Sequence, residues 1–299
     1  MRLMFSIDET ARTFEAVAEE LHDELRGTVM TDRQAVYTHG HQESVLRSHR
    51  SRTAANSAAY LLAELRPGQA LLDVGCGPGT ITADLAELVG PAGRVVAVDT
   101  SAQVLAQAAE YVAGRGLSNV VFEIADVHQL QYRDGEFDVV HAHQVLQHVA
   151  DPVAALREMR RVAVPGGVVA ARDADFAAMT WYPQLPELSD WMALCQRVSR
   201  ANGGEPDAGR RLLSWARAAG FTEIESSSAT WTYATPGQRE WWGGLWADRV
   251  VGSDLADSAI AKGYATPADL ERIADGWRRW AADPDGWFAV LHGEVLARA

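Results

Sequence analysis

The chain has 299 residues, of which 47% are hydrophobic and 22% charged, a balance typical of a globular protein with a full core. Its formal net charge is −13 and no large basic cluster is present, which argues against a nucleic-acid partner. The one arginine-rich stretch, Arg47 to Arg52, is short, and we interpret it as a solvated surface. No apolar run reaches the roughly 18 residues that a membrane span needs.

The N-terminus and the cysteines indicate in which cellular compartment the protein is expected. The opening residues, MRLMFSIDET, meet an acid at Asp8 before an apolar run develops, so we expect no secretory signal. Two cysteines, Cys76 and Cys195, can form neither a disulfide framework nor a zinc site, and we expect no metal. These features favour a reducing, cytoplasmic location.

The predicted elements begin with helices and continue as an alternation of strands and helices. An amphipathic helix is predicted within 8–33, and a second over 53–65, closed by Pro67-Gly68. The predicted strands that follow are 70–74, 94–98, 120–124, 137–141 and 168–171, and the helices between them are 80–89, 101–114 and 152–162. Short apolar strands that alternate with helices predict a parallel sheet covered on both faces.

The C-terminal part is less regular. Helices are predicted over 207–219 and 267–281, and strand-like alternation over 222–234 and 287–297. Two segments that contain tryptophans, about 176–205 and 235–265, fit neither pattern.

A glycine-rich turn, LLDVGCGPGT, joins the strand at 70–74 to the next helix. Its spacing is G-x-G-x-G rather than the G-x-G-x-x-G of dinucleotide sites, and the absence of G-K-[ST] excludes a P-loop. Glycines let a ligand approach the backbone, and open α/β sheets bind ligands at the carboxyl ends of their strands. Asp73 would repel a pyrophosphate but attract an ammonium group, which favours a ligand such as S-adenosylmethionine.

Two more acids stand at strand ends. Asp99 ends the second strand, where a carboxylate can accept both ribose hydroxyls, as it also does in NAD enzymes. Asp126 ends the third strand and can accept from an adenine amino group, with the backbone N–H of Val127 serving a ring nitrogen. The backbone of His143 and Gln144, after the fourth strand, can face a methionine end. The alternative is that these acids only cap helices and turns.

The motifs LLDVGCGPGT, VVAVDTS, ADVHQL and FDVVHAHQVLQHVADP resemble the successive motifs of class I S-adenosylmethionine-dependent methyltransferases, over about 55–175. The resemblance implies a Rossmann-like, doubly wound α/β sheet of seven strands, mostly parallel, whose last strand is antiparallel. The segments 222–234 and 287–297 would be its sixth and seventh strands. Within the class, the chain resembles the ubiquinone/menaquinone-biosynthesis type of small-molecule methyltransferase, and 37–62 resembles the N-terminal entry of some such proteins of secondary metabolism.

The resemblance also implies an organisation and a set of cofactor contacts. Residues 1–66 would form a helical segment that closes over the cofactor, 67–175 the cofactor-binding core, and 176–299 the completion of the sheet with helical lid insertions at about 176–205 and 235–285. The predicted contacts to S-adenosylmethionine are Tyr37, His41, Asp73, Gly75, Cys76, Gly77, Asp99, Thr100, Asp126, Val127, His143 and Gln144.

In methyl transfer the protein mainly orients the acceptor toward the methyl group and excludes water. It supplies a base only where the nucleophile must lose a proton. The fourth strand lacks the Asp/Asn-Pro-Pro-Tyr pattern of enzymes that methylate planar amides. This disfavours nucleic-acid N-methylation and favours O-, C- or amine-type acceptors. His143 and His148 follow the fourth strand and are the candidate bases, since histidine titrates near neutral pH. A buried structural role for His148 is the alternative.

The predicted acceptor contacts are Asp173, Trp181 and Trp241. Aromatic side chains in the two tryptophan-containing segments would suit an apolar or planar acceptor, with ordinary packing as the alternative. Asp173 could bind an acceptor hydroxyl or amine, or cap a turn.

Two other function classes stay open. An NAD-dependent oxidoreductase is disfavoured by the glycine spacing and by Asp73. A non-catalytic interaction module is disfavoured by the complete set of acids, although fold alone never fixes function. A homodimer formed through the N-terminal helix is a further alternative.

Overall fold

A computed structural model describes residues 37–38 and 43–299. The amphipathic helix expected within 8–33 and the predicted cofactor contact His41 lie outside the described residues.

The centre of the fold is a mixed sheet. In the described part of the chain it has eight strands in the order β3-β2-β1-β4-β5-β8-β6, with β7 paired to β8 off this path. The strands are β1 (Ala70–Val74), β2 (Arg94–Asp99), β3 (Val120–Ile124), β4 (Phe137–His143), β5 (Ala163–Ala174), β6 (Thr180–Tyr182), β7 (Ile224–Tyr233) and β8 (Trp287–Arg298). Strands β1 to β5 run parallel, and β8 is antiparallel to both β5 and β7.

This is the Rossmann-like sheet that the sequence predicts, with one addition. β7 and β8 are the strands expected over 222–234 and 287–297, and Ala297 of β8 pairs with Val169 on one side and Ile224 on the other. The additional strand is β6, which extends the sheet by pairing with the first residues of β8.

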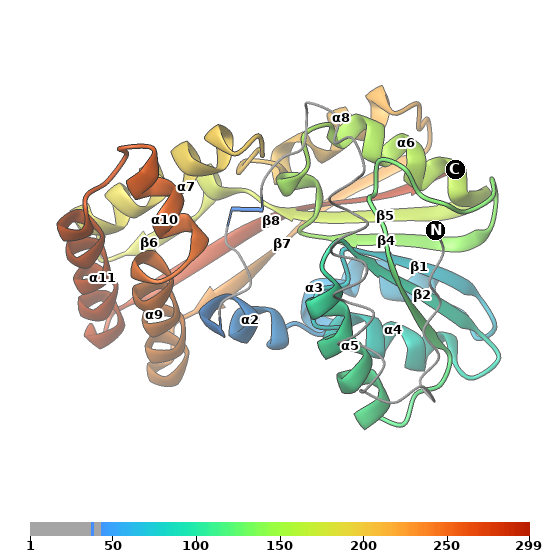
Figure 1. The fold of residues 1–299 in the computed structure, drawn as a ribbon, viewed down its shortest axis with the longest axis horizontal. Helices are drawn as coiled ribbons and strands as arrows, with labels where there is room; N and C mark the ends of the chain where they lie inside the picture. Colours follow the sequence, from blue (N-terminus) through green and yellow to red (C-terminus); the bar gives the residue numbers. More distant parts are fainter. Residues whose placement is uncertain (1–36, 39–42) are drawn as a thin grey trace.

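Helices cover both faces of the sheet because the strands are apolar on both sides (Figure 1). Leu71 and Leu72 of β1 are both fully buried and belong to separate apolar clusters, since successive side chains of a strand point to opposite faces. One face packs against α4 (Thr80–Val89), α5 (Ala102–Gly114) and η1 (Ala59–Glu64). The other packs against α6 (Pro152–Val162) and α8 (Leu212–Ala218).

The helix predicted over 53–65 is wrong as a single element. The chain forms α3 (Ala54–Ser57) and then η1, because Ala58 between them has φ −135°, outside the helical region. The helix predicted over 207–219 likewise divides into η4 (Gly209–Arg211) and α8.

The two tryptophan-containing segments and the helix predicted over 267–281 together form a helical bundle at the far end of the sheet (Figure 1). Its helices, here called the tryptophan bundle, are α7 (Pro186–Ala201), α9 (Pro236–Val251), α10 (Asp254–Ala261) and α11 (Pro267–Ala282). Trp191, Trp277 and Trp280 are fully buried at its centre, and Phe288 of β8 packs among them. The bundle therefore has its own core, which it shares with the sheet through β8.

Three short elements connect these parts: α2 (Glu43–Arg50), η2 (Leu146–His148) and η3 (Phe176–Ala178). Helix α2 contacts α9 of the bundle, where Arg47 donates to Asp248 (3.0 Å) and Arg249 donates to Ser48 (2.8 Å). It also contacts the start of α4, where the Thr80 hydroxyl donates to the carbonyl of His49 (3.3 Å).

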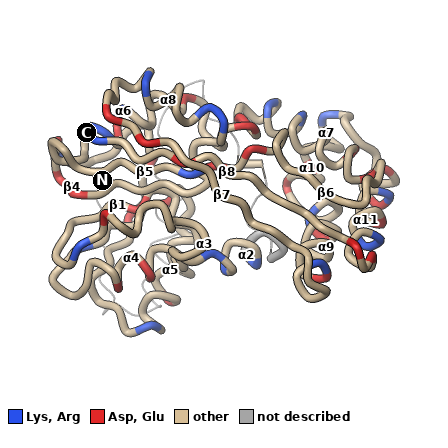
Figure 2. The backbone as a smooth tube through the Cα atoms, turned by 180° about the vertical axis from the view of Figure 1, so that it is seen from behind, with Lys and Arg blue, Asp and Glu red and all other residues tan. Residues whose placement is uncertain are grey.

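The surface charges of the described residues are mixed. Figure 2 shows acidic and basic positions interspersed over α6, α8 and the bundle helices, with no continuous basic face in this view. Among the helices described, none combines the length and the apolarity that crossing a membrane would require.

Candidate functional site

A cavity of about 1110 Å³ extends from the carboxyl ends of β1 to β4 to the tryptophan bundle. Pockets for one small ligand usually measure about 300–1000 Å³, so this cavity can hold more than one group. Its two ends differ in chemistry. The glycine-rich turn, Asp99 and Asp126 line one end, and Trp231 and Trp242 line the other.

The glycine-rich turn exposes its backbone to the cavity. Gly75 and Gly77 have φ of 64° and 55°, a region that favours glycine. A Cβ at Gly75 would collide with the side chain of Val145, whereas one at Gly77 would meet only His49, at 4.0 Å. Cys76 also lines the cavity, but burial raises the pKa of its thiol well above the usual range. Cys76 is therefore a packing residue of the turn rather than a thiolate.

Asp73 is already engaged by the protein. Its side chain accepts hydrogen bonds from the His141 ring (2.8 Å) and from the Thr82 hydroxyl (2.6 Å), and the residue is only 2% exposed. The carboxylate thus ties β4 and α4 to the end of β1. A ligand ammonium would have to share an oxygen with one of these partners.

The acids at the ends of β2 and β3 face the same end of the cavity. Asp99 accepts from the backbone N–H groups of Ser101 (3.0 Å) and Gly77 (3.2 Å), which holds it beside the turn. Asp126 accepts from the backbone (2.9 Å) and the ring (2.7 Å) of His128. These bonds lower the pKa of Asp126 and raise that of His128. The predicted contacts Thr100 and Val127 also line this end.

His143 and Gln144 lie where the two ends of the cavity meet. His143 is only 6% exposed, and neither ring nitrogen has a hydrogen-bond partner among the described residues. Burial lowers its pKa well below the usual range, and the charges of Arg52 and Arg172 lower it further. Gln144 has φ 54°, rare for a residue other than glycine and frequent at functional sites. It accepts from Arg52 (2.6 Å) and lies 2.9 Å from the ring of His292.

His148 and Tyr37 are neighbours in the cavity wall. Their rings meet edge to face with centroids 4.7 Å apart. Burial lowers the pKa of His148 to about 3, so its ring is neutral at physiological pH. The side-chain amide of Gln147 lies 2.8 Å from His148 Nε2. The structure thus brings both candidate bases, His143 and His148, to one cavity in their neutral forms.

Two predicted acceptor contacts need correction. Asp173 and Trp181 do not line the cavity, whereas Trp241 does. Asp173 is fully buried and points to η2, where it accepts from the backbone N–H of Gln147 (3.0 Å). Trp181 lies on β6 and stacks on Phe288 with centroids 5.7 Å apart, so it belongs to the core of the bundle.

The interpretation of 47–52 as a solvated surface is wrong for Arg52. Arg47 is exposed, but Arg52 lines the cavity, with its guanidinium 5.7 Å from the Trp231 ring. Arg249 lines the cavity as well, 4.6 Å from the Trp246 ring. Burial lowers the pKa of each guanidinium to about 10.

Two lining residues of β7, Trp231 and Tyr233, escaped the sequence analysis. Trp242 and Trp246 of α9 also line the cavity, and they lie in one of the two segments where aromatic contacts to the acceptor were expected. In β7 the aromatic residues alternate with Thr230 and Thr232, and this two-residue period could have placed both rings on one face.

Comparisons with known proteins agree with this architecture. The family model described as a methyltransferase domain matches residues 65–225. An uncharacterized methyltransferase of Schizosaccharomyces pombe is 34% identical over 272 residues, which cover 88% of this chain and 96% of that protein. A demethylmenaquinone methyltransferase of Geobacillus stearothermophilus is 36% identical over 121 residues, 40% of this chain and 52% of that protein.

A solved structure shares the fold. It is an N-methyltransferase of Haemonchus contortus in complex with phosphomonomethylethanolamine and S-adenosylhomocysteine. It aligns with a TM-score of 0.53 at 19% identity, over 92% of this chain and 60% of that chain.

The sheet order, the glycine-rich turn and the strand-end acids define a class I S-adenosylmethionine-dependent methyltransferase. The chain belongs to the methyltransferase domain family and is an enzyme whose cofactor is S-adenosylmethionine.

Proposed function

We propose that the protein methylates a small organic acceptor held between the strand ends and the tryptophan bundle. The observation that carries this proposal is the continuity of the cavity, which joins Asp99 and Asp126 at one end to Trp231 and Trp242 at the other. At about 1110 Å³ it has room for a nucleoside cofactor and a planar acceptor side by side.

The residues at the strand ends fit the cofactor in the order that the sequence suggests. Asp99 would accept the ribose hydroxyls, Asp126 and the Val127 backbone would face the adenine, and the open side of Gly77 would lie against the nucleoside or the methionine part. S-adenosylmethionine brings a methyl group on a sulfonium, ready for in-line displacement.

Arg52 is our addition to the cofactor site. Its Nε is buried without a hydrogen-bond partner, and no carboxylate pairs with its guanidinium within the described residues. Arg52 is partly buried, and a cation with restricted access to water and no counter-ion is stabilised by a bound carboxylate. Because Arg52 donates to Gln144 beside the glycine-rich turn, the methionine carboxylate of the cofactor is the natural partner.

We further propose that two parts of the chain enclose the reaction. Helix α2, within the N-terminal segment 1–66, would cover the cofactor, and the tryptophan bundle would act as the lid over the acceptor. The contacts of α2 with both α4 and α9 support this assignment, because α4 follows the glycine-rich turn and α9 carries tryptophans of the cavity wall. Such closure excludes water and fixes the acceptor relative to the methyl group.

The experiment that tests the proposal is calorimetric titration with S-adenosylhomocysteine, run beside an identical titration with NAD. One-to-one binding of S-adenosylhomocysteine without binding of NAD is the expected result. Binding of NAD alone, or of neither, contradicts the proposal.

A second arm measures S-adenosylhomocysteine formation with phenols, quinols and amines as acceptors. Because one relative is named for demethylmenaquinone, a quinol belongs in the first panel. Turnover with a small acceptor is expected. Binding of the cofactor without turnover on any class of acceptor would favour an interaction module instead.

A further inference from the structure

The geometry points to a planar acceptor that presents a hydroxyl oxygen, as a phenol or an enol does, to the ring of His143. A protonated amine, which would need a carboxylate beside it, does not fit this end of the cavity. This inference rests on the proposed function and deepens it by naming the chemical class of the acceptor.

The first observation is the hydrogen-bonding capacity of His143. Its ring is 6% exposed and lines the cavity, yet both nitrogens lack a partner among the described residues. Buried polar groups are nearly always hydrogen-bonded, so a ligand group is expected there. A neutral imidazole offers one donor and one acceptor, and a hydroxyl group matches both, since it can donate to one nitrogen or accept from the other.

The second observation is the charge around His143. The guanidinium carbons of Arg52 and Arg172 lie 5.7 and 5.1 Å from the ring of Trp231, which is itself 5.8 Å from the His143 ring. Glu294 pairs with Arg172 (3.4 Å), and the methionine carboxylate would pair with Arg52, so each cation has a counter-ion once the cofactor is bound. A neutral acceptor therefore fits better than an ammonium, which would need a counter-ion of its own.

Among the described residues that line the cavity, no carboxylate lies at the tryptophan end. In the described lining, the carboxylates are Asp73, Asp99, Asp126 and Asp151. The first three lie at or just after the carboxyl ends of β1, β2 and β3, and Asp151 caps α6 by accepting from Ala154. An ammonium acceptor would find no counter-ion near His143.

The third observation is the shape of the tryptophan end. Tyr233 stacks on Trp242 with centroids 4.3 Å apart and an interplanar angle of 9°, and Trp241 stacks on Trp242 in turn. Flat aromatic walls suit a planar acceptor. The indole N–H of Trp242 lacks a partner in the described structure, and the residue is 5% exposed and lines the cavity. It is a second donor for an acceptor oxygen.

The methyl transfer can be written so that atoms and electrons balance, with the acceptor hydroxyl, the sulfonium and His143 as the participating groups. The acceptor oxygen forms its bond to the methyl carbon while the carbon–sulfur bond breaks, and the sulfur keeps the bonding electron pair. The hydroxyl proton moves to the neutral ring of His143 and from there to solvent. A weak base suffices, because the hydroxyl becomes strongly acidic as the methyl group is transferred.

The test uses the full chain saturated with S-adenosylhomocysteine and three matched probes. These are 2-naphthol, 2-methylnaphthalene, which lacks the hydroxyl, and 2-naphthylmethylamine, which is an ammonium at neutral pH. Equilibrium dialysis should show 2-naphthol binding about two- to tenfold more tightly than 2-methylnaphthalene, as one neutral hydrogen bond allows, and the ammonium binding most weakly.

Variants assign the hydroxyl preference to a residue. In His143→Leu the preference for 2-naphthol should disappear while the affinity for S-adenosylhomocysteine stays the same. Trp242→Phe, which keeps a ring and removes the N–H, should weaken the preference. Trp287→Phe, at an exposed tryptophan 39% accessible to solvent, is the control for Trp242→Phe and should keep it.

Three outcomes would overturn the inference: equal binding of 2-naphthol and 2-methylnaphthalene or no binding of any probe, tightest binding of the ammonium, or a full hydroxyl preference in His143→Leu. Failure of S-adenosylhomocysteine to bind the wild type is a different result. It contradicts the proposed function, and the hydroxyl preference can still be measured on the cofactor-free protein.

Discussion

The carboxylate of Asp173 on β5 accepts a hydrogen bond from the backbone N–H of Gln147, 3.0 Å away in η2. The carbonyl of Gln147 in turn accepts from the backbone N–H of Glu205 (2.9 Å), so the sheet, η2 and the chain after α7 meet at one residue. The second oxygen of Asp173 is buried without a partner among the described residues, and burial raises its pKa to about 8.

The raised pKa predicts a pH-dependent effect of Asp173→Asn. In the unfolded chain an aspartate has a pKa of about 3.9. Between that pH and about 8, the folded state therefore binds more protons than the unfolded state. The wild type therefore loses stability as pH rises through this window. The free energy of unfolding of the asparagine variant should equal that of the wild type at about pH 5. At about pH 8.5 it should be higher than that of the wild type by about 2–4 kcal/mol.

Urea unfolding at the two pH values measures this difference. Asp190→Asn, at an exposed ion pair with Arg272, is the control and should show no such change. A gap between Asp173→Asn and the wild type that is equal at both pH values would contradict the assignment.

Asp99→Ala should weaken the binding of S-adenosylhomocysteine by about 1.5–3 kcal/mol, because a pair of charge-assisted hydrogen bonds to the ribose is lost. Calorimetric titration measures the change. Asp134→Ala, which removes a surface carboxylate 82% exposed, should leave the affinity as it is. Unchanged binding in Asp99→Ala would mean that the ribose lies elsewhere.

Arg52→Gln should separate two parts of the cofactor. Losing a charged hydrogen bond to the methionine carboxylate should lower the affinity for S-adenosylhomocysteine by about tenfold or more. The affinity for 5′-methylthioadenosine, which has no carboxylate, should stay the same. Arg133→Gln, at an exposed arginine that does not line the cavity, is the matched control. Equal losses for both ligands would place Arg52 away from the carboxylate.

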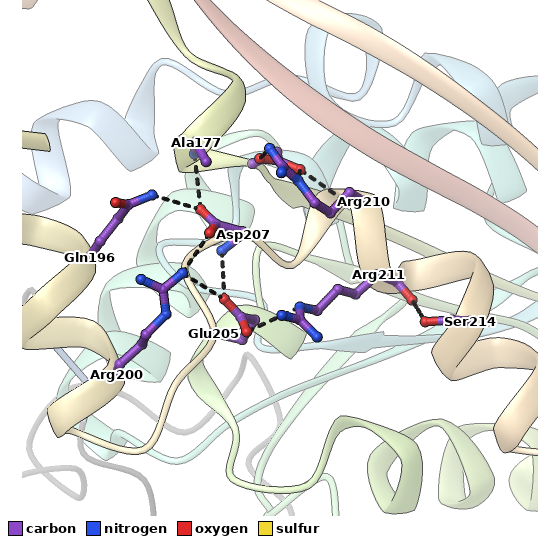
Figure 3. A network of polar contacts seen from close by, with 9 residues as sticks. Ala177, Gln196, Arg200, Glu205, Asp207, Arg210, Arg211 and Ser214 are labelled. Carbon is purple, nitrogen blue, oxygen red and sulfur yellow. Dashed lines mark hydrogen bonds and ion pairs between the residues drawn. The ribbon is translucent and has the colours of Figure 1, made fainter. Parts of the chain in front are cut away.

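Asp207→Ala should loosen the tryptophan bundle. Figure 3 shows Asp207 among the polar residues that join α7 to η4. Its carboxylate accepts from the backbone of Ala177 (2.9 Å), from Gln196 (3.0 Å) and from Arg200 (2.5 Å). Leaving these donors without their acceptor should cost about 2–4 kcal/mol of folding stability, measured by urea unfolding.

The same variant should also raise the KM for the acceptor while the affinity for S-adenosylhomocysteine changes little. Asp190→Ala, which removes an exposed carboxylate from α7, should leave both quantities unchanged. A parallel loss of cofactor affinity would show that the network supports the whole cavity rather than the bundle.

The pH profile of kcat/KM should be flat between about pH 6.5 and pH 8. Burial lowers the pKa of His143 well below its usual range and that of His148 to about 3, so both rings are neutral throughout this interval. Activity should fall only in acid, as the lowered pKa values are approached from above. A midpoint near about pH 6.5 would point to a solvent-exposed base instead.

The strand-end residues of the site could be predicted from the sequence because they depend on local order alone. Parallel strands place their carboxyl ends at one edge, so Asp99, Asp126 and His143 had to come together once the alternation of strands and helices was recognised. The antiparallel last strand came from the family resemblance and is confirmed by the pairing of β5 with β8.

Residues whose placement depends on distant packing could not be predicted. Arg52 reaches the cavity because α2, β7 and α9 converge there from positions nearly 200 residues apart, and a run of arginines carries no sign of this. Asp173 and Trp181 lie within two residues of the cavity-lining Ala174 and Met179 but point elsewhere, since each is held by a partner that only the folded chain supplies.

The shared strand β8 has a consequence for how the chain is made. Phe288 and Val290 belong to the core of the tryptophan bundle, whereas Val295 and Ala297 belong to the core of the sheet. During synthesis on the ribosome, the edge of β5 that pairs with β8 therefore stays without a partner strand until residues 287–298 emerge, more than a hundred residues later. An exposed strand edge invites pairing with other chains. A stall or premature stop before residue 287 should yield a product that aggregates rather than a smaller folded core.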